Sequence, residues 1–198
     1  ILSSGVDLTY NYSVTLEEGK LEITPRPITI TSDSASKVYD GTYLYQQSYS
    51  YDEGKISWHN VSGYDFNSIL NVGTVQNTFK ANIYEYGIDV THNYDITLVY
   101  GTLEIIPRPI TIKPVDEIKI YDGYSLTASS FELSTSSLYD IVSNHVIEGT
   151  FGGSITNVGV TNSNIESYII YSGMEDVTSN YLVTLEEGLL EITPRPVT

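Results

Sequence analysis

Hydrophobic residues recur at every second position along most of the chain, which is the period of a β-strand and not of a helix. In residues 26–32, Ile28 and Ile30 alternate with threonines, and in residues 108–114 Ile110 and Ile112 alternate with Thr111 and Lys113. Because successive side chains of a strand point to opposite faces, this pattern predicts strands with one buried face and essentially no helix.

Shorter alternating runs lie between these segments and are separated by Gly, Asn, Asp and Ser. They are centred on Ile56 and Trp58, on Val75, Phe79, Ala81 and Ile83, and on Ile165, Ile169 and Tyr171. Many short strands with turn residues between them predict β-sandwich domains, with immunoglobulin-like architecture. A partly open barrel and a grasp-like sheet without its helix are the alternatives.

Two apolar runs on either side of a glycine occur at three places in the chain. In "NYDITLVYGTLEI", residues 93–105, alternate apolar positions precede and follow Gly101. Residues 12–23 and 181–192 have the same plan. Alternating runs joined by a short turn are typical of a hairpin, so we expect a hairpin at each of the three places.

Whole phrases of the sequence return in a fixed order, which is the mark of a repeat architecture. The recurring phrases are "LEITPRPITI" (21–30, with "LEIIPRPITI" at 103–112 and "LEITPRPVT" at 190–198), "KVYDG" (37–41, with "KIYDG" at 119–123), "NVG" (71–73 and 157–159) and "DVTHNY" (89–94, with "DVTSNY" at 176–181 and "DLTYNY" at 7–12). The copies divide the chain into residues 1–24, the final hairpin of a preceding repeat, a first complete repeat (25–106), a second (107–193), and the start of a further one (194–198). We expect the chain to be a window of a longer array.

A Pro-Arg-Pro phrase stands between consecutive repeats, at 25–27, 107–109 and 194–196. Proline fixes its own φ and favours an extended conformation in the residue before it, so this phrase predicts a short, stiff joint. With a separate core in each repeat, the domains would follow one another as an elongated rod.

Composition excludes several functions. The chain has no Cys, so disulfides and thiol chemistry are absent, and a core of Ile, Leu, Val and the 18 Tyr is expected. Its 25 acidic and 9 basic residues give a formal net charge of −16, which opposes binding to nucleic acid or to anionic lipid. We expect neither partner, and no run of apolar residues is long enough for insertion into a membrane.

Two recurring polar motifs have two interpretations each. Asp-Gly in the YDG motif is a turn signal, and the alternative is an isopeptide bond from Lys37 to Asn93 and from Lys119 to Asn180. Parity opposes the bond because it leaves both lysines facing outward. The aspartates of the third motif, Asp7, Asp89 and Asp176, are expected to accept backbone N–H groups in Asx turns, and a calcium site is the alternative.

No set of residues has the spacing of a catalytic site. His59 and His145 hold equivalent positions and His92 has no counterpart, so a catalytic dyad or a three-ligand zinc site within one repeat is not expected. We expect no enzyme, cofactor or metal. The surviving alternatives are a structural spacer and a module that binds a carbohydrate or a host protein.

One aromatic cluster is a candidate ligand site. In "TYLYQQSYSYDEG", residues 42–54, the side chains of Tyr43, Tyr45, Tyr49 and Tyr51 share one parity, so a single strand would present all of them on one face. Aromatic side chains stack on sugars and anchor protein interfaces. The alternative is a buried strand face.

The phrases "ITPRPITITSDSASKVYDGT", "NVGT" and "NYDITLVYGTLEI" resemble the MBG or YDG repeat domains of bacterial surface proteins. The resemblance covers both complete repeats and the partial one. It implies a non-catalytic stalk segment of an extracellular, secreted or cell-wall-attached adhesin-like protein. Neighbouring repeats of the same chain are then the direct partners, and any host glycan or protein would be bound by other parts of the parent protein.

Overall fold

The computed structural model describes residues 1–197 and consists of short β-strands in several sheets. The prediction of an all-β protein is confirmed. Three single-turn 3-10 helices occur in residues 1–197: η1 (Thr9–Asn11), η2 (Thr91–Asn93) and η3 (Thr178–Asn180). Each one lies within a copy of the same Asp-containing motif, directly after its first two residues.

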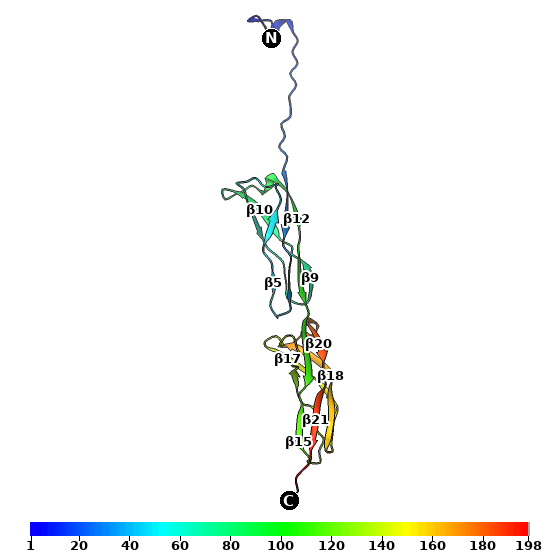
Figure 1. Ribbon diagram of the computed structural model, residues 1–198. Coiled ribbons are helices and arrows are strands. Elements are labelled where there is room, and N and C mark those ends of the chain that lie inside the picture. The colour runs from blue at the N-terminus through cyan, green and yellow to red at the C-terminus, as the bar shows by residue number, and fades with distance from the viewer. Residues whose placement is uncertain (198) are drawn as a thin grey trace.

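The N-terminal residues form two short strands and then an extended segment. Strands β1 (Leu2–Ser3) and β2 (Val6–Asp7) pair with each other. Residues 12–24 contain no strand, and Leu21 and Ile23 are each 99% exposed. The hairpin predicted at residues 12–23 is therefore wrong, because the two apolar runs of this segment stay exposed and do not pair with each other. In Figure 1 the segment extends away from the rest of the molecule.

Residues 26–106, the first segment, contain eleven strands. They are β3 (Arg26–Ser32), β4 (Ala35–Val38), β5 (Leu44–Tyr45), β6 (Tyr49–Tyr51), β7 (Asn60–Tyr64), β8 (Ser68–Ile69), β9 (Gly73–Gln76), β10 (Lys80–Glu85), β11 (Ile88–Asp89), β12 (Tyr94–Val99) and β13 (Thr102–Ile106). The sheets have the orders β12-β3-β6, β11-β10-β7, β4-β13-β9 and β5-β8.

Residues 108–193, the second segment, repeat this arrangement with fewer and longer strands. They are β14 (Arg108–Pro114), β15 (Glu117–Ile120), β16 (Phe131–Leu133), β17 (His145–Gly152), β18 (Gly159–Ser172), β19 (Glu175–Asp176), β20 (Tyr181–Leu185) and β21 (Gly188–Thr193). One sheet has the order β16-β14-β20, and the other has the order β15-β21-β18-β17 with β19 beside β18. Strand β18 takes the places of both β9 and β10. In Figure 1 the two segments lie one beyond the other.

The last two strands of each segment do not pair with each other. Strand β12 pairs in parallel with β3, whereas β13 pairs in parallel with β4 and antiparallel with β9. Strands β20 and β21 repeat this arrangement with β14 and β15. The two hairpins predicted here are therefore wrong. The glycine does not reverse the chain but carries it from one sheet into the other.

Close backbone packing explains why a glycine stands at this crossing. A Cβ atom on Gly101 would lie 2.6 Å from the carbonyl oxygens of Ser32 and Asp33. The Gly101 N–H donates to Ser32 Oγ at 3.0 Å, and this hydroxyl donates to the carbonyl of Asn77 at 2.7 Å. A hairpin and a crossing between sheets both place apolar residues at alternate positions on either side of a glycine. The sequence pattern alone therefore does not distinguish the two topologies.

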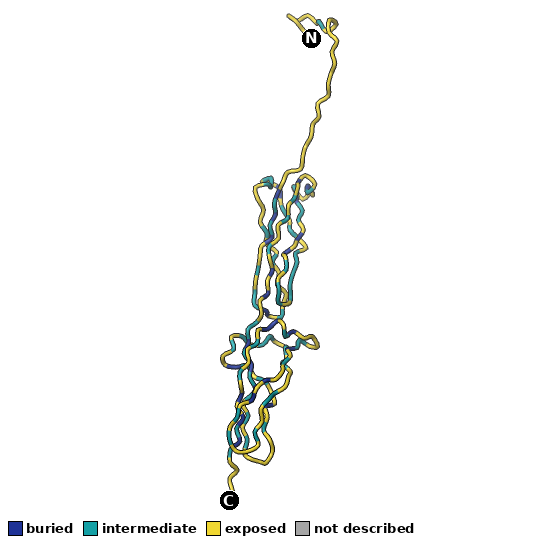
Figure 2. The backbone as a smooth tube through the Cα atoms, turned by 90° about the vertical axis from the view of Figure 1, so that its right-hand side faces the viewer, coloured by how far each residue is buried: buried dark blue, intermediate teal, exposed yellow. Residues whose placement is uncertain are grey.

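The alternating isoleucines of β3 and β14 face the interior, as predicted. Ile28 and Ile30 are 2% and 0% exposed, and Ile110 and Ile112 are 1% and 0% exposed. Buried residues form two clusters. One consists of Ile28, Ile30, Phe79, Ile83, Val90 and Tyr94, and the other of Tyr39, Ile105, Ile110, Ile112, Ile165, Ile170, Val177 and Tyr181. Figure 2 shows buried positions distributed along both segments and none in the N-terminal extension.

The strand expected around Ile56 and Trp58 is not formed. Residues 52–59 make turns, and the Trp58 ring is 58% exposed with its Nε1 donating to Glu85 Oε1 at 3.1 Å. The Lys55 ammonium binds the carbonyl oxygens of Ile56, Ser57 and His59 at 3.2, 3.1 and 2.8 Å. Three carbonyls that converge on one cation hold the backbone in a turn, which side-chain alternation does not reveal.

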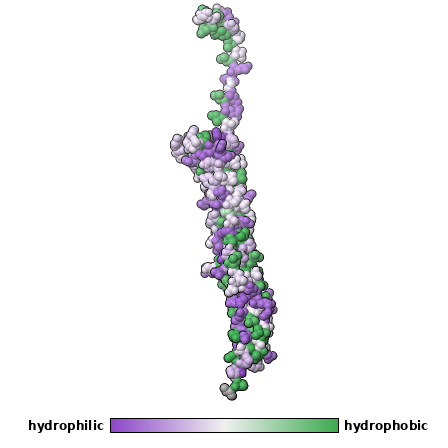
Figure 3. All heavy atoms as spheres, in the orientation of Figure 1, coloured by the Kyte–Doolittle hydropathy of each residue, from purple (hydrophilic) through white to green (hydrophobic). Residues whose placement is uncertain are grey.

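Several large apolar side chains remain on the surface. Figure 3 shows hydrophobic residues on the N-terminal extension and on the part of the second segment nearest the C-terminus. Among the exposed apolar side chains of the second segment are Ile118, Ile120, Val158 and Val160, which are 52–65% exposed. Within residues 1–197, no helix has the length and hydrophobicity of a membrane span.

Candidate functional site at the contact between the two segments

A single residue, Pro107, separates β13 from β14. The joint is thus shorter than the predicted Pro-Arg-Pro phrase, because Arg108 and Pro109 already belong to β14 and lie opposite Tyr181 and Leu182 of β20. With so short a linker the end of the first segment must lie directly against the beginning of the second.

The side chain of Tyr39, from the first YDG motif, is the centre of this contact. It is 3% exposed, and its ring meets Tyr181 of the second segment edge-on at a centroid distance of 5.7 Å. The His145 ring lies 6.1 Å away. Burial raises the pKa of the Tyr39 hydroxyl, so the ring enters the contact uncharged.

Arg108 fastens the Tyr39 backbone to the second segment. Its Nη1 donates to the Tyr39 carbonyl at 3.2 Å, and its Nε donates to the Asp140 carbonyl at 2.6 Å. The guanidinium also covers the Tyr139 ring at 4.8 Å from the centroid. The arginine of Pro-Arg-Pro therefore joins the YDG turn to the loop that precedes β17.

Asn180, from the third recurring motif, provides a second link. It is 2% exposed, its Oδ1 accepts from the Val72 N–H at 2.7 Å, and its Nδ2 donates to Asn71 Oδ1 at 3.0 Å. Asn71 and Val72 belong to the NVG motif of the first segment. Three phrases that recur in the sequence, YDG, NVG and the Asn-Tyr pair, thus meet at one place.

His145, the histidine at the start of β17, is hydrogen-bonded to the Tyr181 side chain. The Tyr181 hydroxyl lies 2.7 Å from His145 Nδ1 and accepts from the Val142 N–H at 3.2 Å. Burial lowers the pKa of His145, which favours the neutral ring. Val142, Tyr181 and His145 therefore form the surface of the second segment that the YDG turn contacts.

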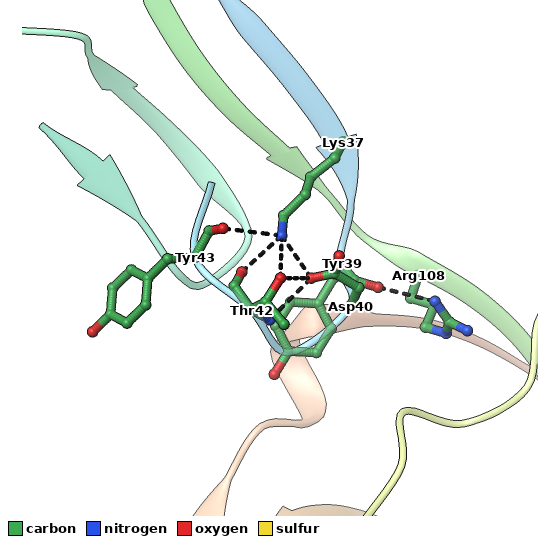
Figure 4. A network of polar contacts seen from close by, with 6 residues as sticks. All are labelled: Lys37, Tyr39, Asp40, Thr42, Tyr43 and Arg108. Atoms are coloured by element: carbon green, nitrogen blue, oxygen red, sulfur yellow. Dashed lines mark hydrogen bonds and ion pairs between the residues drawn. The ribbon is translucent and has the colours of Figure 1, made fainter. Parts of the chain in front are cut away.

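The YDG turn itself is held by a lysine (Figure 4). Lys37 Nζ lies 2.6 Å from Asp40 Oδ1 and 2.8 Å from the Thr42 carbonyl, and Asp40 Oδ1 also accepts from the Thr42 N–H at 2.9 Å. Burial would raise the pKa of Asp40, but these hydrogen bonds outweigh it and lower the pKa to about 2. Gly41 has φ +78°, and a Cβ atom there would lie 2.9 Å from Val142 Cγ1.

The apolar interior continues across the contact. Tyr39 and Ile105 of the first segment belong to the same buried cluster as Ile110, Ile170 and Val177 of the second. The expectation of a separate core in each repeat is therefore wrong at this joint. A linker of one residue leaves no room for solvent between the segments, so their ends pack as one interior.

Each segment carries both halves of this contact, and the outer halves are open. Tyr121, the counterpart of Tyr39, is 38% exposed, and nothing lies within 4 Å of a Cβ built on Gly123. At the other end, the Tyr94 hydroxyl lies 2.7 Å from His59 Nδ1, as in the Tyr181–His145 pair, and Asn93 is exposed. The residues that form the contact thus occur in both segments, and the contact is formed once, between the end of the first segment and the beginning of the second.

The lysines of the isopeptide hypothesis serve the YDG turns instead. Lys119 Nζ lies 2.8 Å from Asp122 Oδ1, as Lys37 does with Asp40. The Asn180 amide is engaged by Asn71 and Val72. Neither lysine contacts the asparagine proposed for it, so the turn interpretation is confirmed and the bond interpretation is contradicted. The expectation that both lysines face outward is wrong, because their side chains are only 20% and 22% exposed.

The three motif aspartates form the predicted Asx turns. Asp7, Asp89 and Asp176 accept from the N–H groups of Thr9, Thr91 and Thr178 at 2.8, 2.8 and 2.9 Å. Hydrogen bonds from these threonines lower the pKa of all three carboxyl groups. Over residues 1–197, no group of three or more His, Asp or Glu side chains is arranged to hold a metal ion.

The four tyrosines of the candidate ligand site do not share a strand face. Tyr45 is in β5, Tyr49 and Tyr51 are in β6, and these strands belong to different sheets. Tyr43 and Tyr45 are 53% and 58% exposed with ring centroids 5.8 Å apart, whereas Tyr49 is half-buried. The expectation of a single strand is wrong because Gln46, Gln47 and Ser48 carry the chain to the other sheet.

The contact residues Arg108 and Asn71 were not among the candidate residues, and Asn180 was considered only as a partner of Lys119 in the isopeptide alternative. Their signal was present, since all three stand in phrases that recur, but recurrence alone does not tell an internal contact from a turn. No protein-family model matches the chain, and no curated protein matches it.

Proposed function

We propose that the chain is a non-catalytic structural spacer, made of tandem immunoglobulin-like β-sandwich domains arranged as a rod. The observation that supports this best is the joint, where one residue links the segments and where Tyr39, Arg108 and Asn180 fix one against the other. A joint with side-chain bonds on several sides resists bending, which is what a spacer needs.

The placement of this spacer in a bacterial cell-surface or secreted adhesin-like protein rests on the resemblance of its motifs to MBG and YDG repeats. The formal charge of −16 agrees with that role, since like charges keep neighbouring stalks apart and soluble. Neighbouring repeats would be its main partners.

Pulsed electron–electron double resonance, which measures the distance between two spin labels, tests the spacer directly. The chain contains no Cys, so spin labels can be attached at Tyr86→Cys and Tyr124→Cys, which replace side chains that are 85% and 76% exposed in different segments. The expected result is one narrow distance distribution. A broad distribution, or a short distance from segments folded onto each other, would contradict the proposal.

The alternative function is carbohydrate or host-protein binding by the exposed pair Tyr43 and Tyr45, whose rings lie 5.8 Å apart. Paired aromatic rings on a surface offer a stacking platform for a sugar. A glycan array probed with the chain and with Tyr43→Ala would support this function if binding occurs and the substitution removes it.

A further inference from the structure

The second segment has an open groove between two strands of different sheets. It lies between β16 and β17 and has a volume of about 720 Å³, and six of its twelve lining residues are large apolar ones. The volume is within the range of about 300–1,000 Å³ that is usual for ligand sites. Phe131 and Phe151 meet at one place in its wall with ring centroids 4.5 Å apart.

The groove runs along strand edges. Its walls include consecutive residues of both strands, 131–133 of β16 and 145–149 of β17. Because neighbouring residues point to opposite faces, a wall that contains all of them follows the edge of the strand. Within residues 1–197, β16 pairs with β14 alone and β17 with β18 alone, so each keeps one free edge.

The first segment shows how such a groove is closed. Tyr49 and Phe131 hold the same place, because β6 and β16 pair with β3 and β14 in the same register. The Tyr49 hydroxyl crosses to β7 and donates to the Val61 carbonyl at 2.9 Å, while its ring stacks on Phe66 and Phe79.

The second segment lacks this crossing bond. His59 and His145 are equivalent, so Val61 corresponds to Ile147 of β17. Phe131 has no hydroxyl to reach the Ile147 carbonyl. Without this hydroxyl, no such bond joins β16 to β17 at this point. The backbone groups on the free edges of these strands can therefore pair with another chain.

Charge identifies the kind of chain that fits. Glu132 and Glu148 both line the groove, and Glu132 shares Lys113 with Asp116 at 3.0 and 3.1 Å. Glu148 has no ion-pair partner among residues 1–197. The extended segment at residues 12–24 of a second copy carries three glutamates and one lysine, so it would be repelled.

We propose that the groove between β16 and β17 binds an extended peptide segment of a partner protein, which has apolar side chains at alternate positions and a basic residue beside Glu148. The peptide pairs its backbone with a free strand edge and packs its apolar side chains against Phe131, Ile147 and Phe151. This binding activity adds to the spacer role and does not depend on it.

A titration of the full, ¹⁵N-labelled chain with the synthetic peptide acetyl-KVTVTVK-amide tests the proposal. We expect saturable shifts at the amide groups of β16 and β17. The matched peptide EVTVTVE should produce none of these shifts because of its charge, and KVTPTVK should bind about tenfold more weakly because proline removes a backbone donor.

Two conservative variants distinguish the groove from the rest of the surface. Phe131→Tyr restores the hydroxyl that closes the first segment, and we expect it to weaken KVTVTVK binding about tenfold. Tyr49→Phe should open the first segment, so that new shifts appear along β6 and β7. Amide spectra without peptide verify that both variants fold.

Three results would overturn the proposal. They are equal binding by Phe131→Tyr and the unchanged chain, shifts gathered on Tyr43 and Tyr45 or on another surface instead of β16 and β17, and absence of any shift at saturating peptide. Equal shifts with the acidic peptide would overturn the assigned role of Glu148.

Discussion

Tyr39 and Tyr121 stand in two copies of the same YDG motif and have opposite surroundings. The first is 3% exposed against Tyr181, and the second is 38% exposed. The motif therefore does not determine the burial of its tyrosine, which depends on whether another segment lies against it. This pair provides a controlled comparison within one molecule.

We expect Tyr39→Ala to lower the free energy of unfolding by about 3–5 kcal/mol, the usual cost of removing a buried aromatic ring. Tyr121→Ala should change it by less than about 1 kcal/mol, because little is lost at an exposed site. Urea denaturation of the two variants measures both. Equal effects would contradict the prediction, because burial of Tyr39 against the second segment would then add nothing to its contribution.

The acidic YDG turn should make stability depend on pH. The pKa of Asp40 is lowered from 3.8 to about 2, so its bonds stabilise the fold above pH 3.8 and this contribution is lost as the pH falls towards 2. We expect Asp40→Asn to cost about 1 kcal/mol at neutral pH, after allowance for solvent screening, and almost nothing at pH 2.

Denaturation at several pH values checks this prediction. Glu53→Gln is the matched control, since Glu53 is exposed and lies outside the turn. A difference between Asp40→Asn and the unchanged chain that persists undiminished at pH 2 would contradict the role of the carboxylate.

At the scale of elements, the crossing between sheets distinguishes this fold from a series of hairpins. Strands β3 and β12 run in parallel. The chain then continues from β3 into β4 and from β12 into β13, and these two strands pair with each other in the other sheet. Gly101 stands where these two passing chains are closest.

We expect Gly101→Ala to destabilise the chain by about 1–3 kcal/mol, because its Cβ would meet the Ser32 and Asp33 backbone at 2.6 Å and the strands must separate. Gly19→Ala is the control, since nothing lies within 4 Å of a Cβ there. Thermal unfolding compares the two. A neutral Gly101→Ala would show that the crossing has room for a side chain.

The sequence predicted strands well and pairings poorly. Ile28, Ile30, Ile110 and Ile112 are buried as their alternation indicates, because parity depends only on the local chain. Pairing depends on distant residues. Gly101 was consistent with a hairpin turn, and only its approach to Ser32 and Asp33 shows a crossing. Asn180 could not be assigned, since its partners lie 108 and 109 residues earlier in the chain.

At the scale of the whole molecule, the shared interior should make the two segments move together. We expect residual dipolar couplings of both segments to fit one alignment tensor. Asn180→Ala should disturb this, because the Val72 N–H loses its acceptor at the contact. Asn93→Ala, at the equivalent and exposed position, is the control. Two independent tensors for the unchanged chain would contradict a fixed joint.

The parallel pairing of β3 with β12 and of β14 with β20 has a mechanical consequence. The chain enters a segment at the beginning of the first strand of each pair and leaves beyond the second, so tension applied at the two ends slides these neighbours in opposite directions along their length. All the hydrogen bonds between them then carry the load simultaneously and cannot open one after another. A segment pulled at its two ends should therefore unfold only at high force.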